Sequence, residues 1–159
     1  RKQYVDDAIS LVGLNDFKKF LPKQLSGGLL RRLNIACGIA HKPKLIFWDE
    51  PTVAVDPQSR NHILDGIKKL RDQGATIVYT THYMEEVVDA DKIYVMDHGH
   101  VVMEGTPKEI FSQVDTLKHY RLDVPQVTIL ADELKKRGLD ILDGILTKEE
   151  LVEALCQLK

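Results

Sequence analysis

The chain has 159 residues, of which 43% are hydrophobic and 29% are charged. This is ordinary globular composition, and the length suits one domain with at most a small appendage. The net charge of −2 argues against a dedicated nucleic-acid-binding protein, so we expect no nucleic-acid partner. Cys37 and Cys156 form no CxxC pair, which argues against a disulfide framework. No apolar run approaches the roughly 18 residues that a membrane span needs.

Apolar spacing predicts a helix over residues 2–21, in which Gly13 is a stop signal, and a second helix from Ser26 to about Ala40. The opening residues lack the apolar segment of a signal peptide and start directly in a helical pattern. We therefore expect the chain to begin inside a domain. Residues 45–48 form an unbroken apolar run, which predicts a parallel strand buried on both faces.

The following patterns predict a helix from Asp56-Pro57 to Gly74, a strand over 76–80, a short helix over 84–90, a hairpin over 93–103 and a helix over 107–112. Strands that alternate with helices indicate an α/β fold with parallel strands. Residues 113–159 show two helical patterns, near 125–137 and 147–158, and no strand. We predict two domains, 1–112 and 113–159, the second a small helical extension.

Leu25-Ser26-Gly27-Gly28 stands where the second helix begins. Ser26 can cap the helix, and the two glycines leave backbone N–H groups accessible to an anion at the positive end of the helix dipole. A simple Ser-Gly cap without a ligand explains the same residues, and alone it is the better explanation.

Asp49 and Glu50 follow the apolar strand of residues 45–48, at the end where open α/β sheets bind ligands. Asp49 can hold Mg²⁺ directly or through water, because Mg²⁺ prefers few carboxylates together with phosphates and waters. Glu50 can polarise an attacking water. A solvent-facing acidic pair is the competing explanation, and the buried run before it disfavours that explanation.

Two further candidates are Asp56 in Val-Asp-Pro and His82 after the strand of residues 76–80. Taken singly, Asp56 is explained as a helix N-cap and His82 as a solvated residue at a strand end. Asp49 and His82 close neighbouring predicted strands, so both are expected to reach one pocket.

The order and spacing of these four pieces resemble the ATP-binding-cassette (ABC) ATPases. Leu-Ser-Gly-Gly resembles their signature motif, LIFWDEP their Walker B motif, VAVD their D-loop and TTH their switch histidine. The resemblance covers roughly residues 1–112. It implies the C-terminal part of a P-loop NTPase core, with part of the helical subdomain.

The resemblance also implies roles and cofactors, namely ATP and Mg²⁺. Asp49 would coordinate Mg²⁺ through water, Glu50 would be the catalytic base, and His82 would contact the γ-phosphate. Ser26, Gly27 and Gly28 would bind the γ-phosphate of ATP held by a second subunit. Asp56 would communicate across that interface. The reaction would be phosphoryl transfer to water.

The tail resembles the C-terminal extension of energy-coupling-factor transporter ATPases, through LDVPQV, LADEL, RGLD and ELVEAL. The implied partners are a second ATPase subunit and a transmembrane transporter subunit. The implied location is the cytoplasmic face of the membrane, and the implied role is powering the uptake of vitamins or metal ions. RRLNIA and THYMEE look more like the ATPases of drug exporters.

No Gly-x-x-x-x-Gly-Lys-Ser/Thr motif occurs in the chain, so the phosphate-binding P-loop is absent from these residues and we expect the chain to be inactive alone. Other interpretations are therefore a non-catalytic, truncated or engineered chain that self-associates through its tail, and the ATPase of a drug exporter. Leu29 and Leu30 depart from the polar and basic residues that usually follow the signature. We interpret Arg31 and Arg32, with nearby lysines, as a solvated helix face.

Overall fold

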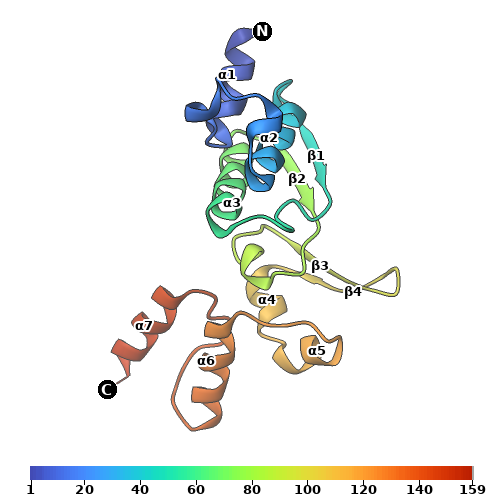
Figure 1. Ribbon diagram of the computed structural model, residues 1–159. Helices are drawn as coiled ribbons and strands as arrows, with labels where there is room; N and C mark the ends of the chain where they lie inside the picture. The colour runs from blue at the N-terminus through green and yellow to red at the C-terminus, as the bar shows by residue number, and fades with distance from the viewer. Residues whose placement is uncertain (159) are drawn as a thin grey trace. The chain divides into compact units, whose positions relative to one another are not determined.

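The computed structural model describes residues 1–158, and the chain divides into two compact units, Arg1–Thr81 and His82 onward (Figure 1). The first unit contains a strand–helix–strand segment with parallel strands, which confirms the α/β prediction. The second unit combines a β-hairpin with short helices. The predicted division into residues 1–112 and 113–159 stays a prediction.

The elements of the first unit are α1 (Lys2–Leu11), α2 (Gly27–Ile39), β1 (Leu45–Trp48), α3 (Pro57–Asp72) and β2 (Thr76–Tyr79), with short 3-10 helices at Asn15–Phe17 and Pro22–Gln24. The predicted helix over 2–21 is wrong in length, because α1 ends before Gly13, whose φ is +66°. β1 and β2 pair in parallel, with Leu45 opposite Thr76 and Trp48 opposite Tyr79.

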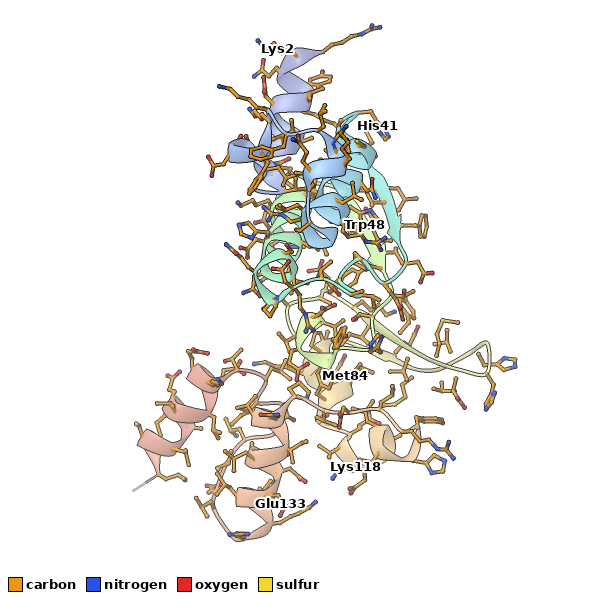
Figure 2. All side chains as sticks on the ribbon, in the orientation of Figure 1. Lys2, His41, Trp48, Met84, Lys118 and Glu133 are labelled. Atoms are coloured by element: carbon orange, nitrogen blue, oxygen red, sulfur yellow. The ribbon has the colours of Figure 1, made fainter. Side chains whose placement is uncertain are left out.

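The core of this unit lies between its helices and one face of the sheet. Val12 and Ile63 are almost fully buried, and Ile46 of β1 packs into the same cluster. Trp48, labelled in Figure 2, is half-buried against this cluster. The other face of the sheet is open, since Leu45, Phe47 and Val78 are 52%, 70% and 47% exposed. The prediction that the 45–48 run is buried on both faces is wrong for this chain.

Arg32 is a buried charge that joins two helices. Its guanidinium donates to the carbonyl of Val12 at 2.7 Å and to that of Gly13, so it satisfies the end of α1 from α2. Burial lowers the pKa of Arg32, and the nearby Asp56 carboxylate opposes this shift. The interpretation of Arg32 as part of a solvated face is therefore wrong.

The second unit begins with a 3-10 turn, Met84–Glu86, where a helix over 84–90 was predicted. Its other elements are β3 (Ile93–Asp97), β4 (His100–Gly105), α4 (Pro107–Phe111), α5 (Val114–His119), α6 (Gln126–Lys136) and α7 (Lys148–Gln157). The hairpin and the helices α4, α6 and α7 agree with the predictions, and α5 was not predicted. One hydrophobic core of this unit contains the buried side chains of Ile110, Phe111 and Leu117, together with Val95 of β3.

The tail helices pack through a second cluster, and α7 begins at a capping box. Thr147 accepts from the amide of Glu150 at 3.2 Å, and the Glu150 carboxylate accepts from the amide of Leu146 at 2.8 Å and of Thr147 at 3.2 Å. Lys108 of α4 lies 3.3 Å from the same carboxylate. In residues 1–158 no helix is both long enough and apolar enough to cross a bilayer.

Glu150 gives the second unit a predictable acid dependence. The Leu146 amide, followed by Lys108 and the Thr147 amide, lowers the pKa of Glu150 below its usual value of 4.5. A lowered pKa in the folded state stabilises the fold above the unfolded-state pKa, and this contribution is lost as the pH falls through the folded value. We expect Glu150→Gln to flatten the decline in unfolding free energy as the pH falls below about 5, measured by urea titration. The exposed Glu149→Gln variant should keep the wild-type slope, and equal slopes in all three proteins would contradict the assignment.

Candidate functional site

The first part of the site is the N-terminus of α2, where Ser26 is the N-cap. Its hydroxyl accepts from the amide of Leu29 at 3.3 Å, and its carbonyl accepts from the amide of Leu30 at 2.8 Å. The predicted cap is confirmed. The amides of Gly27 and Gly28 precede the hydrogen-bonded ladder of the helix, and such amides at a positive helix end favour an anion.

The two glycines of the signature motif have different surroundings. A Cβ on Gly27 would meet nothing within 4 Å, whereas a Cβ on Gly28 would lie 2.6 Å from Ser59 Oγ and collide with Asp56 Oδ2. Gly28 is buried and Gly27 is exposed. Gly28 is therefore required for close packing of α2 on the start of α3, while Gly27 leaves open space before the helix.

The second part is the acidic turn, residues 49–51, which follows β1. Thr80, directly after β2, donates its hydroxyl to Asp49 Oδ1 at 2.6 Å and accepts the amide of Glu50 at 3.0 Å. The parallel register brings Thr80 here, because its amide donates to the carbonyl of Trp48 at 3.0 Å. Sequence reasoning did not single out Thr80. A hydroxyl directly after the neighbouring parallel strand was the available signal.

The acidic turn has an unusual backbone. Glu50 has a φ of +44°, and Ala54, beyond the turn, has a φ of +57°, both in the left-handed region that disfavours residues with a Cβ. Such conformations persist only where surrounding contacts enforce them, and they concentrate at functional sites.

Arg31 of α2 supplies such contacts. Its guanidinium donates to the carbonyls of Asp49 at 3.2 Å, Glu50 at 3.0 Å and Pro51 at 3.2 Å. The interpretation of Arg31 as part of a solvated face is wrong, because the side chain is half-buried and holds three consecutive carbonyls. Periodicity places Arg31 on the helix but carries no information about these backbone partners.

The two parts meet around one open hollow of about 370 Å³. It is lined by the start of α2 at the signature motif (residues 25–28, the signature turn), by Arg31 further along α2, by the acidic turn and by the segment before α3. The lining residues are Gly27, Arg31, Asp49, Glu50, Val53, Ala54 and Val55. Two acidic residues, an arginine and a glycine at a helix start thus line a space of small-ligand size.

Asp56 lies beside this hollow as the N-cap of α3. Its Oδ1 accepts from the amide of Ser59 at 2.8 Å, and this bond, the largest cause, lowers the pKa of Asp56. The carboxylate is exposed, so it caps the helix and also faces solvent. Its position next to Gly28 links the start of α3 to the start of α2.

His82 begins the second unit and is exposed, with its ring centroid 4.3 Å from that of Tyr83. The strands whose ends were expected to place Asp49 and His82 together do pair in parallel. The approach of His82 to the acidic turn stays a prediction.

The side chains around Asp49 suit Mg²⁺ only if water and phosphate oxygens supply most of the ligands of the ion. Among residues 1–158, no three side chains of His, Cys, Asp or Glu gather into a metal-binding group. The few exposed carboxylates beside an open hollow, those of Asp49 and Glu50, fit an ion that keeps most of its ligands as water and phosphate oxygens, which is how Mg²⁺ is commonly bound. Asp49 is the residue that would hold it.

Two protein-family models match the chain. The model described as ABC transporter matches residues 1–53, which include the signature turn and the acidic turn. The model of the energy-coupling factor transporter EcfA1 C-terminal domain matches residues 128–159.

Curated relatives match nearly the whole chain. The energy-coupling factor transporter ATP-binding protein EcfA1 of Caldanaerobacter subterraneus is 50% identical over 157 residues, which are 98% of this chain and 57% of the relative. EcfA1 of Clostridium perfringens is 50% identical over 159 residues, with 99% and 57% covered. The chain thus spans somewhat more than half the length of these relatives.

Solved structures support the same fold. CbiO1 from Clostridium perfringens, described as part of the ABC transporter complex cbiONQ, has a TM-score of 0.64 and 29% identity, covering 82% of this chain and 53% of its own. MJ1267, an ATP-binding cassette of an ABC transporter, also has a TM-score of 0.64, at 24% identity and with 75% and 49% covered, and supports the fold alone.

The contrast between the two glycines predicts opposite effects of one methyl group. Gly28→Ala should lower the free energy of unfolding by about 1–3 kcal/mol, because the methyl group overpacks the contact with Asp56 and Ser59. Gly27→Ala, the matched control, should leave stability unchanged or slightly raised. Urea titration of both variants checks this, and an equal loss in both would contradict the packing explanation.

Proposed function

We propose that this chain, which belongs to the ATP-binding-cassette family, works in an ATPase subunit that couples Mg-ATP hydrolysis to uptake of a micronutrient, a vitamin or a metal ion. The observation that carries this proposal is the acidic turn, in which the Thr80 hydroxyl orients Asp49 and holds the amide of Glu50 at the end of a parallel strand. The uptake role is supported by 50% identity to energy-coupling factor ATP-binding proteins over 98% of the chain.

In the proposed reaction Glu50 is the base that polarises the attacking water. The backbone of Glu50, whose φ is +44°, sets the direction in which its side chain leaves the turn. The Glu50 amide is held by the Thr80 hydroxyl. Asp49 would hold Mg²⁺ through water, with its Oδ1 oriented by the Thr80 hydroxyl. The ion would supply neutralisation of charge on the phosphates. His82 contacts the γ-phosphate and stabilises the charge that develops in the transition state.

The signature turn serves the nucleotide of a second subunit. Ser26 can donate its hydroxyl proton to a phosphate oxygen while it accepts from Leu29, because a hydroxyl group both donates and accepts. Gly27 offers its amide in open space, whereas Gly28 keeps α2 close to α3 and offers only its backbone. Asp56, beside Gly28, communicates across the interface. These 159 residues hold no P-loop motif, so the tests of this reaction add a P-loop segment.

The proposed partners are a second ATPase subunit and a transmembrane subunit at the cytoplasmic face of a membrane. Relatives include both EcfA1 and EcfA2 proteins, the latter 43% identical over 94% of this chain. In the tail, Leu142, Val152 and Leu155 are 82%, 59% and 37% exposed, which gives a partner subunit apolar side chains to cover.

The role of Glu50 is tested by Glu50→Gln in a protein that joins this chain to a P-loop segment. Glutamine keeps the size of the side chain but cannot act as a base, so turnover should fall at least a hundredfold while Mg-ATP binding stays within a few-fold. Steady-state phosphate release and calorimetric titration measure the two quantities. The exposed tail variant Glu149→Gln is the control and should match the wild type. Undiminished phosphate release by Glu50→Gln would refute the base assignment.

The association of the tail is tested by a charge on its exposed surface. Val152→Glu should weaken self-association at least fivefold, because a buried carboxylate at an interface costs free energy that an exposed one does not. Sedimentation over a concentration series measures the dissociation constant. Glu153→Gln, the neighbouring exposed position, is the control, and an unchanged constant in Val152→Glu would remove this role from the tail.

A further inference from the structure

We propose that Arg31 is a positioning residue that joins the acidic turn to α2, so that the signature end of α2 and Glu50 move as one body. The consequence for ATP hydrolysis rests on the proposed function of Glu50. The connection itself is a property of the fold and is measured without nucleotide.

The contact is unusually dense for one side chain. The Arg31 Nη2 lies 3.2 Å from the carbonyl oxygen of Asp49 and 3.0 Å from that of Glu50, and its Nε lies 3.2 Å from that of Pro51. Three consecutive carbonyls are thereby gathered around one guanidinium. The planar guanidinium provides several donors in fixed directions, whereas a lysine ammonium on a flexible stem cannot copy this arrangement.

Glu50 is the residue in the turn that needs such support. Its φ of +44° is unfavourable for a residue with a Cβ, so the turn relaxes unless contacts hold it. The peptide groups of Glu50 are held at both ends, since its amide donates to Thr80 at 3.0 Å and its carbonyl accepts from Arg31 at 3.0 Å. Thr80 fixes the turn to β2, and Arg31 fixes it to α2.

The helix that carries Arg31 is itself firmly held. Arg32, the next residue, is buried and donates to Val12 and Gly13 at the end of α1. Ser26 caps the same helix five residues before Arg31. Displacement of the signature turn by a ligand therefore displaces Arg31, and Arg31 displaces the carbonyls of the acidic turn.

This path joins two functions that face different nucleotides. Under the proposed function, the signature turn meets the ATP of a second subunit and Glu50 acts on the ATP of its own subunit. Arg31 then couples nucleotide binding at one site to the position of the catalytic base at the other site. A chain of contacts is not by itself evidence of coupling, so the proposal is tested by a double-variant cycle.

The first measurement is hydrogen exchange of the Glu50 amide by NMR, in this chain without nucleotide. Arg31→Met should speed this exchange at least fivefold, although the Thr80 acceptor is unchanged, and Arg31→Lys should lie between Met and wild type. The amides of Ile63 and Leu70 in the α3 core should keep their rates in every variant. Arg137→Met, at an exposed position of the other unit, is the matched control and should leave Glu50 unchanged.

The second measurement is the cycle with Ser26→Ala, which loosens the first turn of α2 by removing its cap. Ser26→Ala should speed Glu50 exchange at least twofold in the wild-type background and have no effect in the Arg31→Met background. Additive effects, or an unchanged Glu50 rate in both Arg31 variants, would overturn the proposal. If Arg31→Met also speeds exchange in the α3 core, the Arg31→Lys variant decides: a wild-type Glu50 rate in it overturns the proposal. A normal ATPase rate in Glu50→Gln would refute the proposed function and leave this connection standing.

Discussion

The parallel pairing of β1 with β2 is the constraint on which the site depends. Because Trp48 lies opposite Tyr79, β1 and β2 end at the same edge of the sheet. Thr80, which follows β2, therefore lies beside Asp49 and Glu50, which follow β1. One hydroxyl then orients a carboxylate and fixes the amide of the following residue. A shift of the register by one residue would remove both bonds, since neighbouring side chains on a strand point to opposite faces.

The helices add a second constraint to this edge. α2 approaches α3 closely only because Gly28 has no side chain, and this approach brings the start of α2 to the segment before α3. Arg31 follows on the same helix and contacts the carbonyls after β1. The hollow is therefore built from three segments that are separate in sequence, each held by a different kind of contact: packing, side-chain hydrogen bonds and backbone pairing.

The helices and strands that depend on local sequence preferences were predictable from the sequence. Caps and apolar spacing located α2, α3 and α7, and the apolar runs located β1 and β2, because these elements depend on local preferences. The length of α1 was wrong, since Gly13 ended the helix earlier than the spacing suggested. Burial of β1 on both faces was also wrong, because an apolar run states a preference and not which residues cover it.

Motif order drew attention to residues that line the hollow, and their functional roles stay predictions. Thr80 and Arg31 contact backbone atoms of Glu50, which no motif describes. Arg32 was misinterpreted for a related reason, since its partners are the carbonyls of Val12 and Gly13. Backbone carbonyls are present at every position, so only the folded structure reveals which of them a side chain reaches.

The most direct measurement of the central claim is a crystal structure of a protein that joins this chain to a P-loop segment, carries Glu50→Gln and is soaked with Mg-ATP. The γ-phosphate should lie at the Gly27 amide of one subunit, with the ion one water from Asp49 of the other subunit and residue 50 of that other subunit facing the γ-phosphate. Nucleotide bound away from Gly27 of one subunit and Asp49 of the other would contradict the proposed function.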